Sequence, residues 1–309
     1  MARKKSEKTN VKDDVARKIT DKMIAAMEEG LEGKWERPWV SAMTTAWLMG
    51  QKRPAQGFNW LILAVEESFG GKDGPWATYN QWQALGGQVR KGEKSTVCLR
   101  PLILPDKKKI AEGDEDAKFI IWKSVLYFAA SQQDGWVRPE SDGPVGETSE
   151  QAEQWWTAFT KVADVRYGGD RAYYSPSYDY IQLPHGDTFT TVEGSFGTRF
   201  HEAIHWTGHK DRLNREDHKV WGDNTYAFEE LVAELGASIM ANYLGIADEG
   251  ANSAKYLQSW LKGLRSEDGP ELLWKAAGAA SKAAKYLLDL VAEKPEVEEA
   301  KEAKELVPA

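Results

Sequence analysis

Three of the five histidines in this 309-residue chain lie in one short stretch, HEAIHWTGHKD at residues 201–211. His201, Glu202 and His205 form the pattern H-E-x-x-H. Residues four apart share one face of a helix, so the two imidazoles can bind a single divalent ion. Glu202 is poorly placed to be a ligand, but it can accept a proton from a water molecule at the site. The pattern predicts a metal-dependent hydrolase with Glu202 as its general base. The alternative is a surface helix that carries histidines without binding a metal.

Two segments could supply a third metal ligand. In the downstream stretch EELVAE, Glu230 and Glu234 are one helical turn apart, so Glu230 could bind the ion while Glu234 orients a ligand histidine. Glu229 points about 100° away from Glu230 and is the weaker candidate. Asp211 completes an H-E-x-x-H-x-x-G-x-x-D spacing like that of metzincins, but no Met-turn follows it. We favour Glu230 and keep Glu229 and Asp211 as alternates.

Other residues could support this site. His209 could be a fourth ligand, but a histidine at a helix end more often interacts with the terminal carbonyls, so we place it beside the ligands. Three tyrosines could stabilise the oxyanion that forms during peptide hydrolysis: Tyr173, Tyr174 and Tyr226. The strand pattern YYSPSYDYIQLP could bind an extended peptide along its edge. Two histidines and one glutamate suit zinc, and manganese is a further option.

A second candidate site lies in the first half of the chain, in GPWATYNQWQALGGQVRKGEKS. Aromatic rings beside a basic, glycine-containing loop suit single-stranded DNA, because rings stack on bases and cations contact phosphates. The alternative is a tryptophan-rich core with a solvated basic turn. The candidate DNA-binding residues are Trp76, Tyr79, Trp82, Arg90, Lys91 and Lys94.

The distribution of charge allows such a role. The net charge is −8, but residues 1–140 carry 23 Lys and Arg against 19 Asp and Glu, whereas residues 141–309 carry 17 against 29. Phosphate binding depends on a local face, so the basic first half leaves nucleic-acid binding open. The single cysteine, Cys98, allows no internal disulfide. With no long apolar run and no secretory signal, we expect a cytoplasmic protein without a membrane partner.

The periodicity of apolar residues predicts the elements that position these groups. Two strands, 95–104 and 118–131, should pair across a charged loop at 105–117, and 171–184 should form a strand or hairpin. A short helix is expected after Pro75. Longer helices are expected at 13–31, 57–68, 149–163, 193–209, 225–244, 252–265 and 270–292.

These elements predict an α+β protein of two domains. The Gly, Pro, Ser and acidic residues of 131–150 mark a boundary. We expect a disordered N-terminus, a first domain, a linker, a second domain and a flexible charged tail, over residues 1–12, 13–138, 139–150, 151–292 and 293–309 respectively.

The order of these motifs resembles the ArdC family of plasmid and phage antirestriction proteins, which is also related to the N-terminal part of TraC-type plasmid primases. The resemblance covers roughly residues 13–290, and only residues 41–56 clearly depart from the family pattern. The segments that carry it are ITDKMIAAMEEG, ERPW, GFNW, WATYNQWQALGGQVRKGEKS, LYFAASQQDGW, GGDRAYYSPSYDYIQLP, FHEAIHWTGHKDRLNR, YAFEELVAELGA and YLQSWLKGL.

The resemblance implies a small α+β domain that binds single-stranded DNA, followed by a mostly helical zincin-like metallopeptidase domain with a small sheet. The family's H-E-x-x-H falls on His201, Glu202 and His205, and its E-E-L-V-A-E motif supports Glu230 as the third ligand, as in gluzincins. The implied role is protection of incoming plasmid or phage DNA from restriction, with a restriction-system component as a possible protein substrate. Two alternatives stay open: a DNA-binding antirestriction protein with a purely structural metal, and an intracellular metallopeptidase without a DNA role.

Overall fold

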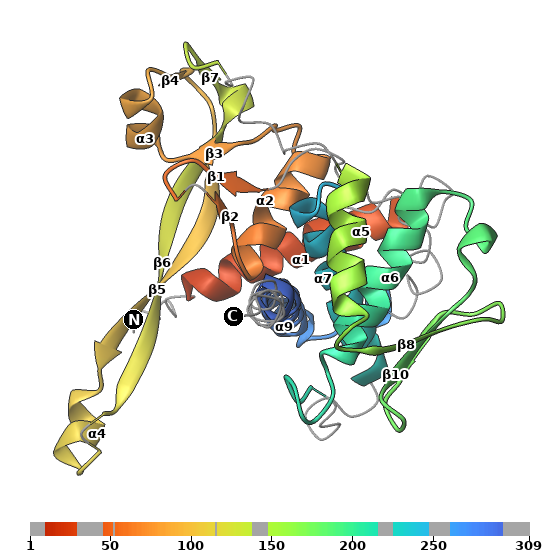
Figure 1. Cartoon of the computed structure of the whole chain (residues 1–309). Coiled ribbons are helices and arrows are strands. Elements are labelled where there is room, and N and C mark those ends of the chain that lie inside the picture. The colour runs from red at the N-terminus through yellow and green to blue at the C-terminus, as the bar shows by residue number, and fades with distance from the viewer. Residues whose placement is uncertain are drawn as a thin grey trace, which may run out of the picture. The chain divides into compact units, whose positions relative to one another are not determined.

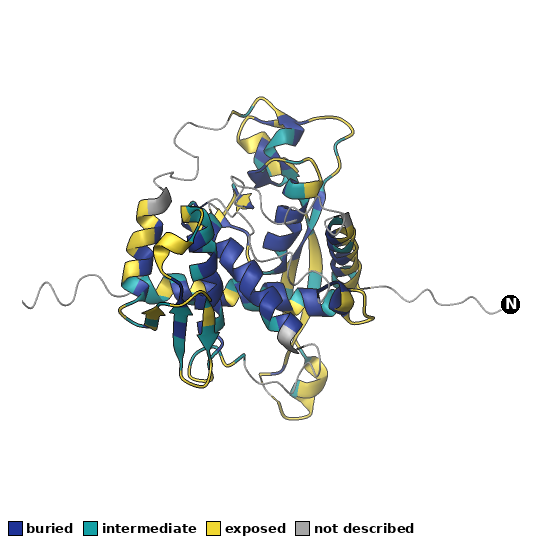
Figure 2. Cartoon of the chain, turned by 90° about the vertical axis from the view of Figure 1, so that its right-hand side faces the viewer, coloured by how far each residue is buried: buried dark blue, intermediate teal, exposed yellow. Residues whose placement is uncertain are grey.

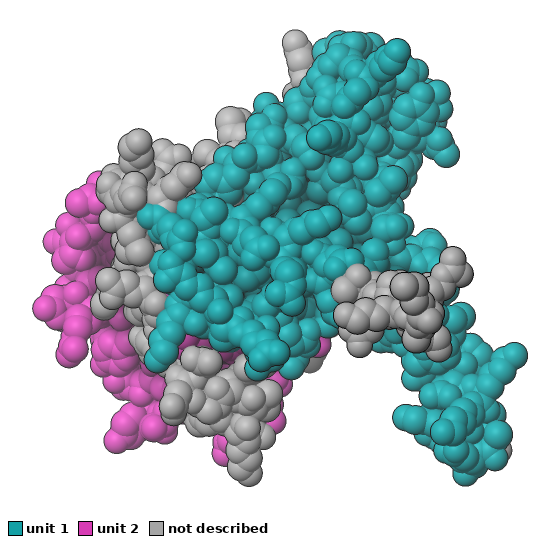
Figure 3. Space-filling view, turned by 180° about the vertical axis from the view of Figure 1, so that it is seen from behind, with its two compact units in different colours: residues 1–39, 44–138, 261–275 teal, residues 40–43, 139–260, 276–309 magenta. Residues whose placement is uncertain are grey.

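The computed structural model forms two compact units (Figure 3). Each unit combines helices with a small sheet. Unit 1 comprises residues 1–39, 44–138 and 261–275, and unit 2 comprises 40–43, 139–260 and 276–309. This confirms the predicted two-domain α+β class. The residues described are 10–29, 46–51, 53–114, 116–137, 148–215, 225–246 and 260–292.

Parts of the predicted organisation lie outside the described residues. These parts are the first nine residues, most of the linker, most of the helix expected at 252–265, and the charged tail. Within the described segments, no helix combines the length and the apolar character that a membrane crossing requires.

Unit 1 is built on a mixed five-stranded sheet with the strand order β2-β1-β3-β6-β5 (Figure 1). Three strands are only two residues long: β1 (Trp47–Leu48), β2 (Arg53–Pro54) and β3 (Trp76–Ala77). The other two, β5 (Thr96–Pro105) and β6 (Lys118–Ala129), pair antiparallel along ten residues, as the sequence predicted. Since β3 pairs only with the last two residues of β6, most of this hairpin extends as a two-stranded ribbon.

The outer edge of the ribbon is partly closed by a side chain. Asn59 on α2 (Phe58–Phe69) donates to the carbonyl oxygen of Leu99 at 2.7 Å and accepts from its N–H at 2.8 Å. The amide group of Asn59 thus pairs with β5 as a neighbouring strand would. Pro101 and Pro105 further along β5 have no N–H to offer.

The apolar stripes of α1 (Val11–Glu29) and α2 form the main core of unit 1. Met23 and Met27 on α1 and Leu61 and Leu63 on α2 are fully buried. Figure 2 shows how buried and exposed residues are distributed over the chain. Cys98 is also buried and burial raises the pKa of its thiol, as expected of a packed side chain rather than a nucleophile.

A smaller module follows β3 in unit 1. Thr78 begins α3 (Tyr79–Ala84) with a capping box, in which its side chain accepts from the N–H of Gln81 and the Gln81 side chain accepts from the N–H of Thr78. The strands β4 (Gln88–Val89) and β7 (Gln133–Asp134) then pair antiparallel. Trp82 and Val89 form the core of this module together with Ala77.

Unit 2 places helices beside a three-stranded sheet of order β8-β10-β9, in which β9 is an edge strand. The hairpin of β9 and β10 confirms the strand pattern predicted for residues 171–184. The elements are α5 (Thr148–Phe159), β8 (Asp164–Tyr167), β9 (Tyr173–Ser175), β10 (Tyr180–Leu183), α6 (Val192–Trp206), α7 (Thr225–Tyr243) and the greater part of α9 (Gly269–Ala292).

Several elements differ from the prediction, among them the two-residue strands β1, β2, β3, β4 and β7, which were not predicted. The charged segment 105–117, expected as a loop, contains the short helix α4 (Lys107–Ala111), because the Asp106 side chain accepts from the N–H groups of Lys108 and Lys109 and caps it. Strand β8 was missed altogether. It pairs in parallel with β10, which follows it in sequence, and such pairing leaves little local signal.

We expect Gly236→Ala to destabilise the contact between α6 and α7. A Cβ at Gly236 would lie 2.7 Å from Cδ1 of Ile204, so the Ile204 side chain or one of the two helices must move. We expect this to lower the free energy of unfolding by roughly 1–3 kcal/mol. The matched control is Gly278→Ala on α9, whose Cβ would meet no atom within 4 Å. Helix propensity should stabilise that variant by up to about 1 kcal/mol. Urea unfolding measures both, and equal stabilisation of the two variants would contradict the tight contact.

Candidate functional site

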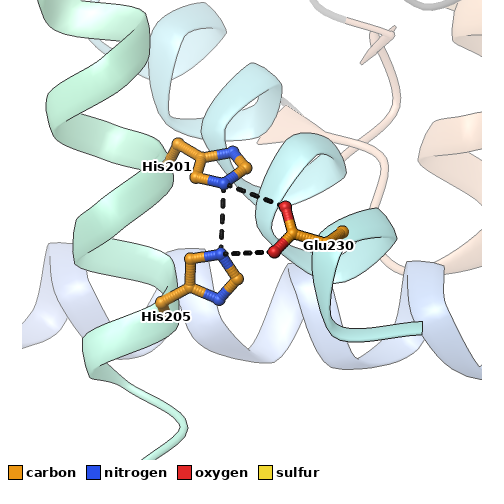
Figure 4. A group of neighbouring side chains, drawn as sticks. All are labelled: His201, His205 and Glu230. Atoms are coloured by element: carbon orange, nitrogen blue, oxygen red, sulfur yellow. Dashed lines mark hydrogen bonds and ion pairs between the residues drawn. The ribbon is translucent and has the colours of Figure 1, made fainter. Parts of the chain in front are cut away.

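The helices α6 and α7 bring His201, His205 and Glu230 together in unit 2 (Figure 4). The side chain of Thr191 accepts from the N–H of Gly194 at 3.0 Å and caps the start of α6. The close packing at Gly236 then sets α7 against this helix. The two histidines therefore face a carboxylate from a different helix.

The donor atoms of these three residues converge. The two histidine Nε2 atoms are 3.1 Å apart. The Glu230 carboxylate oxygens lie 3.5 Å from His201 Nε2 and 3.7 Å from His205 Nε2. Ligands bound tetrahedrally at about 2.0–2.1 Å from zinc are about 3.4 Å apart, so these separations fit one ion of that size. In the part of the chain that the structure describes, no other group of His, Cys, Asp or Glu is close enough to hold a metal.

Each histidine has a second carboxylate at its other ring nitrogen. Glu234 Oε1 lies 3.4 Å from His201 Nδ1, and Glu229 Oε1 lies 3.4 Å from His205 Nδ1. A proton held on Nδ1 by a carboxylate leaves Nε2 free to bind a metal and fixes the orientation of the ring. Glu234 therefore lies against His201. Glu229, considered above as a ligand, lies against Nδ1 of His205 instead.

Arg215 holds Glu229 in this position. Its guanidinium donates to both carboxylate oxygens of Glu229, at 2.9 and 3.2 Å, and also to the carbonyl oxygen of Ile204 and the hydroxyl of Thr207 at 2.7 Å each. Gly208 leaves room for the pair, since a Cβ there would lie 3.2 Å from Arg215 Nη2. Arg215 thus ties the end of α6 to α7.

The pKa values in the site reflect burial and these contacts. Burial lowers the pKa of His201, but hydrogen bonds to Glu230 and Glu234 outweigh burial and raise that pKa well above its usual value. A divalent cation competes with the proton for this ring, so metal binding should weaken as the pH falls. Burial raises the pKa of Glu229, but its hydrogen bond with His205 and its contacts with Arg215 lower the pKa to about 2.

The other candidates for this site are Glu202, Asp211 and His209. Glu202 is buried on α6 directly after His201. The exposed carboxylate of Asp211 lies 3.5 Å from His209 Nδ1, so these two residues contact each other rather than the converging donor atoms. The geometry therefore favours Glu230 over Asp211 as third ligand.

The candidate oxyanion donors are engaged in other contacts. The hydroxyl of Tyr174 donates to Asp179 at 2.9 Å and accepts from Arg212 at 3.2 Å. The hydroxyl of Tyr173 lies 3.1 Å from that of Tyr180. The side chain of Tyr226 lies outside the described residues. We therefore find no support for Tyr173 or Tyr174 as oxyanion donors in this conformation. Asp179 and Arg212, which sequence reasoning missed, instead anchor the β9–β10 hairpin to the segment after α6.

The structure corrects the predicted DNA-binding role of two tryptophans. Trp76 and Trp82 are both 0 % exposed. The indole N–H of Trp76 donates to Glu67, and that of Trp82 donates to the carbonyl oxygen of Phe128 at 2.9 Å. Such rings have no free face for a base, so both are core residues, as the alternative interpretation of the sequence held.

Tyr79 and the basic residues lie on the surface of the α3–β4–β7 module, but Arg90 is neutralised there. Its guanidinium forms ion pairs with Asp134 at 3.1 Å and with Glu93 at 2.9 Å, and these hydrogen bonds raise its pKa. Lys91 and Lys94 are exposed, and neither forms an ion pair with any residue that the structure describes. Of the three candidate cations, the two lysines are thus left to contact phosphates. Tyr79, Arg90 and Lys91 also line a cavity of about 570 Å³.

Comparison with known protein families matches both halves of the chain. Residues 13–154 match the N-terminal domain of the anti-restriction factor ArdC, and residues 150–279 match a zincin-like metallopeptidase domain. Among solved structures, ArdC from plasmid R388 is 33% identical. Its metal-free crystal structure superposes with a TM-score of 0.73 over 92% of this chain and 100% of that chain. Its Mn(II)-bound structure superposes with a TM-score of 0.70 over 91% of this chain and 99% of that chain.

Two relatives differ in how much of them the chain covers. The uncharacterized protein y4eC of Sinorhizobium fredii is 33% identical over 285 residues, which are 89% of this chain and 91% of that protein. A DNA primase TraC of Escherichia coli is 30% identical over 288 residues, which are 87% of this chain but only 19% of the primase. The chain therefore corresponds to nearly all of the first and to a small part of the second.

We expect Arg215→Ala to weaken metal binding by about 10–100-fold, because Glu229 loses the partner that holds it against His205. Glu230→Ala should abolish binding, since it removes a donor atom. Isothermal titration calorimetry with Zn²⁺ and Mn²⁺ measures both effects.

The matched control for this prediction is Arg199→Ala. Arg199 lies on the same helix, pairs with Glu153 at 2.9 Å and does not contact either histidine. The Arg199→Ala variant should bind the metal with unchanged affinity, and so should the Asp211→Ala variant. Equal losses for Arg199→Ala and Arg215→Ala would show that the effect is not specific to the Glu229 contact.

Proposed function

Because this chain belongs to the ArdC family of antirestriction proteins, we propose that it protects incoming plasmid or phage DNA from host restriction. In this proposal unit 1 binds single-stranded DNA and unit 2 carries a metal-dependent peptidase site. The convergence of His201, His205 and Glu230 is the observation that most supports the second part. We place the activity in the cytoplasm, where restriction enzymes meet incoming DNA.

His201, His205 and Glu230 would hold the metal ion in this site. Their chemistry suits zinc, and the likeness to a Mn(II)-bound ArdC structure supports manganese as well. A bound divalent ion acts as a Lewis acid that polarises a carbonyl and lowers the pKa of water. The histidines are oriented for this by Glu229 and Glu234.

Glu202 is the proposed general base. It is buried and directly follows His201 on α6, and a carboxylate beside a bound metal can take the proton of the attacking water and pass it to the leaving amine. The edge strand β9 offers a place where an extended peptide can add as a further strand. A component of the restriction system is the protein substrate we propose.

A structural metal is the second candidate function. His201, Glu230 and Glu234 are 7 %, 7 % and 1 % exposed, and buried charges require compensation that a cation supplies. In this case protection of DNA depends on unit 1 alone, and the metal only stabilises unit 2.

Glu202→Gln distinguishes these two functions. Since Glu202 is not a ligand in the proposal, the variant should bind metal as the unchanged protein does and should lose peptidase activity by a factor of at least about 100. Cleavage of a denatured-protein substrate, metal content and plasmid survival in a restricting host would be measured together. Protection that survives without cleavage supports the structural metal, whereas unchanged cleavage contradicts the role of Glu202.

Binding of single-stranded DNA predicts a steep dependence on salt. Each phosphate contact contributes about −0.7 to the slope of log K against log salt concentration, so replacing both Lys91 and Lys94 by alanine should reduce the slope by about 1.4. Fluorescence anisotropy of a labelled oligonucleotide between low and moderate salt measures the slope. Lys107 and Lys108, replaced together on α4, are the control. A wild-type protein without salt-dependent binding would favour a metallopeptidase with no DNA role.

A further inference from the structure

The α3–β4–β7 module contains a cavity of about 570 Å³ that the metal chemistry does not use. This volume lies in the range of about 300–1,000 Å³ typical of small-ligand sites, so the cavity can hold one nucleotide but not a duplex. Tyr79 and Phe128 form two of its walls, with ring centroids 6.5 Å apart and planes inclined by 69°. A flat ligand can stack on one ring while its edge contacts the other.

The Tyr79 ring is exposed but held in place. It is 41 % exposed, and its hydroxyl accepts hydrogen bonds from the side-chain amides of Gln88 at 3.1 Å and Gln83 at 3.4 Å. A ring fixed in advance loses little conformational freedom on binding. Tyr79 is therefore a ready stacking surface, unlike the buried tryptophans on either side of it in sequence.

The two carboxylates of the cavity disfavour a phosphate beside them. Glu93 and Asp134 line it, and both are bound to Arg90, so these three side chains together carry one negative charge. Carboxylates accept hydrogen bonds from amino groups, as they do from the amino group of cytosine. Lys91 also lines the cavity, and it has no ion pair among the described residues.

We propose that this cavity binds a single unstacked nucleobase that carries an amino group, with Tyr79 stacked on the base, Asp134 accepting from the amino group, and Lys91 contacting the adjoining phosphate. This inference rests on the proposed binding of single-stranded DNA and adds a base preference to it. Thymine has no exocyclic amino group, so runs of cytosine should bind more tightly than runs of thymine. Both are pyrimidines that stack weakly on themselves, which makes them a matched pair of probes.

The test compares labelled (dC)20 and (dT)20 by fluorescence anisotropy on the full chain. The unchanged protein should prefer (dC)20 by about fivefold or more. Tyr79→Ala should weaken binding of both by about tenfold or more, while Tyr79→Phe keeps the ring and most of the affinity. Asp134→Asn should reduce the preference for (dC)20, because the neutral amide can also donate to thymine.

Two control variants match these changes in chemistry. Tyr178→Ala removes an exposed tyrosine of unit 2, and Asp116→Asn removes an exposed acid of unit 1 outside the cavity. Neither should change affinity tenfold or alter the ratio between the two oligonucleotides. Circular dichroism confirms that each variant is folded.

Each outcome has a distinct meaning. If the unchanged protein binds neither oligonucleotide, the proposed DNA binding itself is wrong. If it binds both and Tyr79→Ala binds as well as Tyr178→Ala does, DNA binding stands and the cavity is not the base site. If Tyr79→Ala loses affinity but Asp134→Asn keeps the full preference, stacking stands and recognition of the amino group is overturned.

Discussion

A buried ionisable side chain is stable only when a partner compensates its lost hydration, and this constraint determines how the helices of unit 2 pack. Three ionisable side chains from α6 and α7 converge on one point, His201, His205 and Glu230, and a fourth, Glu234, lies behind His201. None of them would be stable in an apolar interior without the others. The helices can come close enough only because Gly236 has no side chain to separate them from Ile204. The hydrogen bonds of Arg215 then fix the end of α6 against Glu229. The site is therefore a property of the packed helix pair rather than of one helix.

The sequence predicted those parts of this site that depend on local geometry. The i, i+4 spacing of His201 and His205, and that of Glu230 and Glu234, is a property of any helix. The position of Glu229 could not be predicted in this way, because it depends on where Arg215 returns after the end of α6. The same holds for the pair Tyr174 and Asp179, whose contacts with Arg212 depend on where the β9–β10 hairpin meets the segment after α6.

In unit 1 the hairpin of β5 and β6 followed from a strand pattern on either side of a charged loop. The burial of Trp76 and Trp82 could not be predicted from the sequence, because a tryptophan beside basic residues gives the same pattern whether it faces the core or the solvent. Only the tertiary contacts with Glu67 and Phe128 decide this. Likewise, a count of cations overstated the positive charge near Arg90, since Asp134 approaches it from a strand more than 40 residues away.

The amide of Asn59 and the two prolines of β5 have a consequence for the solubility of the chain. The ribbon carries Ile103 and Ile120 at 61 % and 55 % exposure, a composition that favours self-association when a strand edge is free. Among the described strands, β5 is such an edge. Its backbone at Leu99 is already paired with Asn59, and Pro101 and Pro105 cannot donate to an incoming strand. The β5 edge of the ribbon therefore has little tendency to extend the sheet into another copy of the chain, although apolar side chains lie on the ribbon surface.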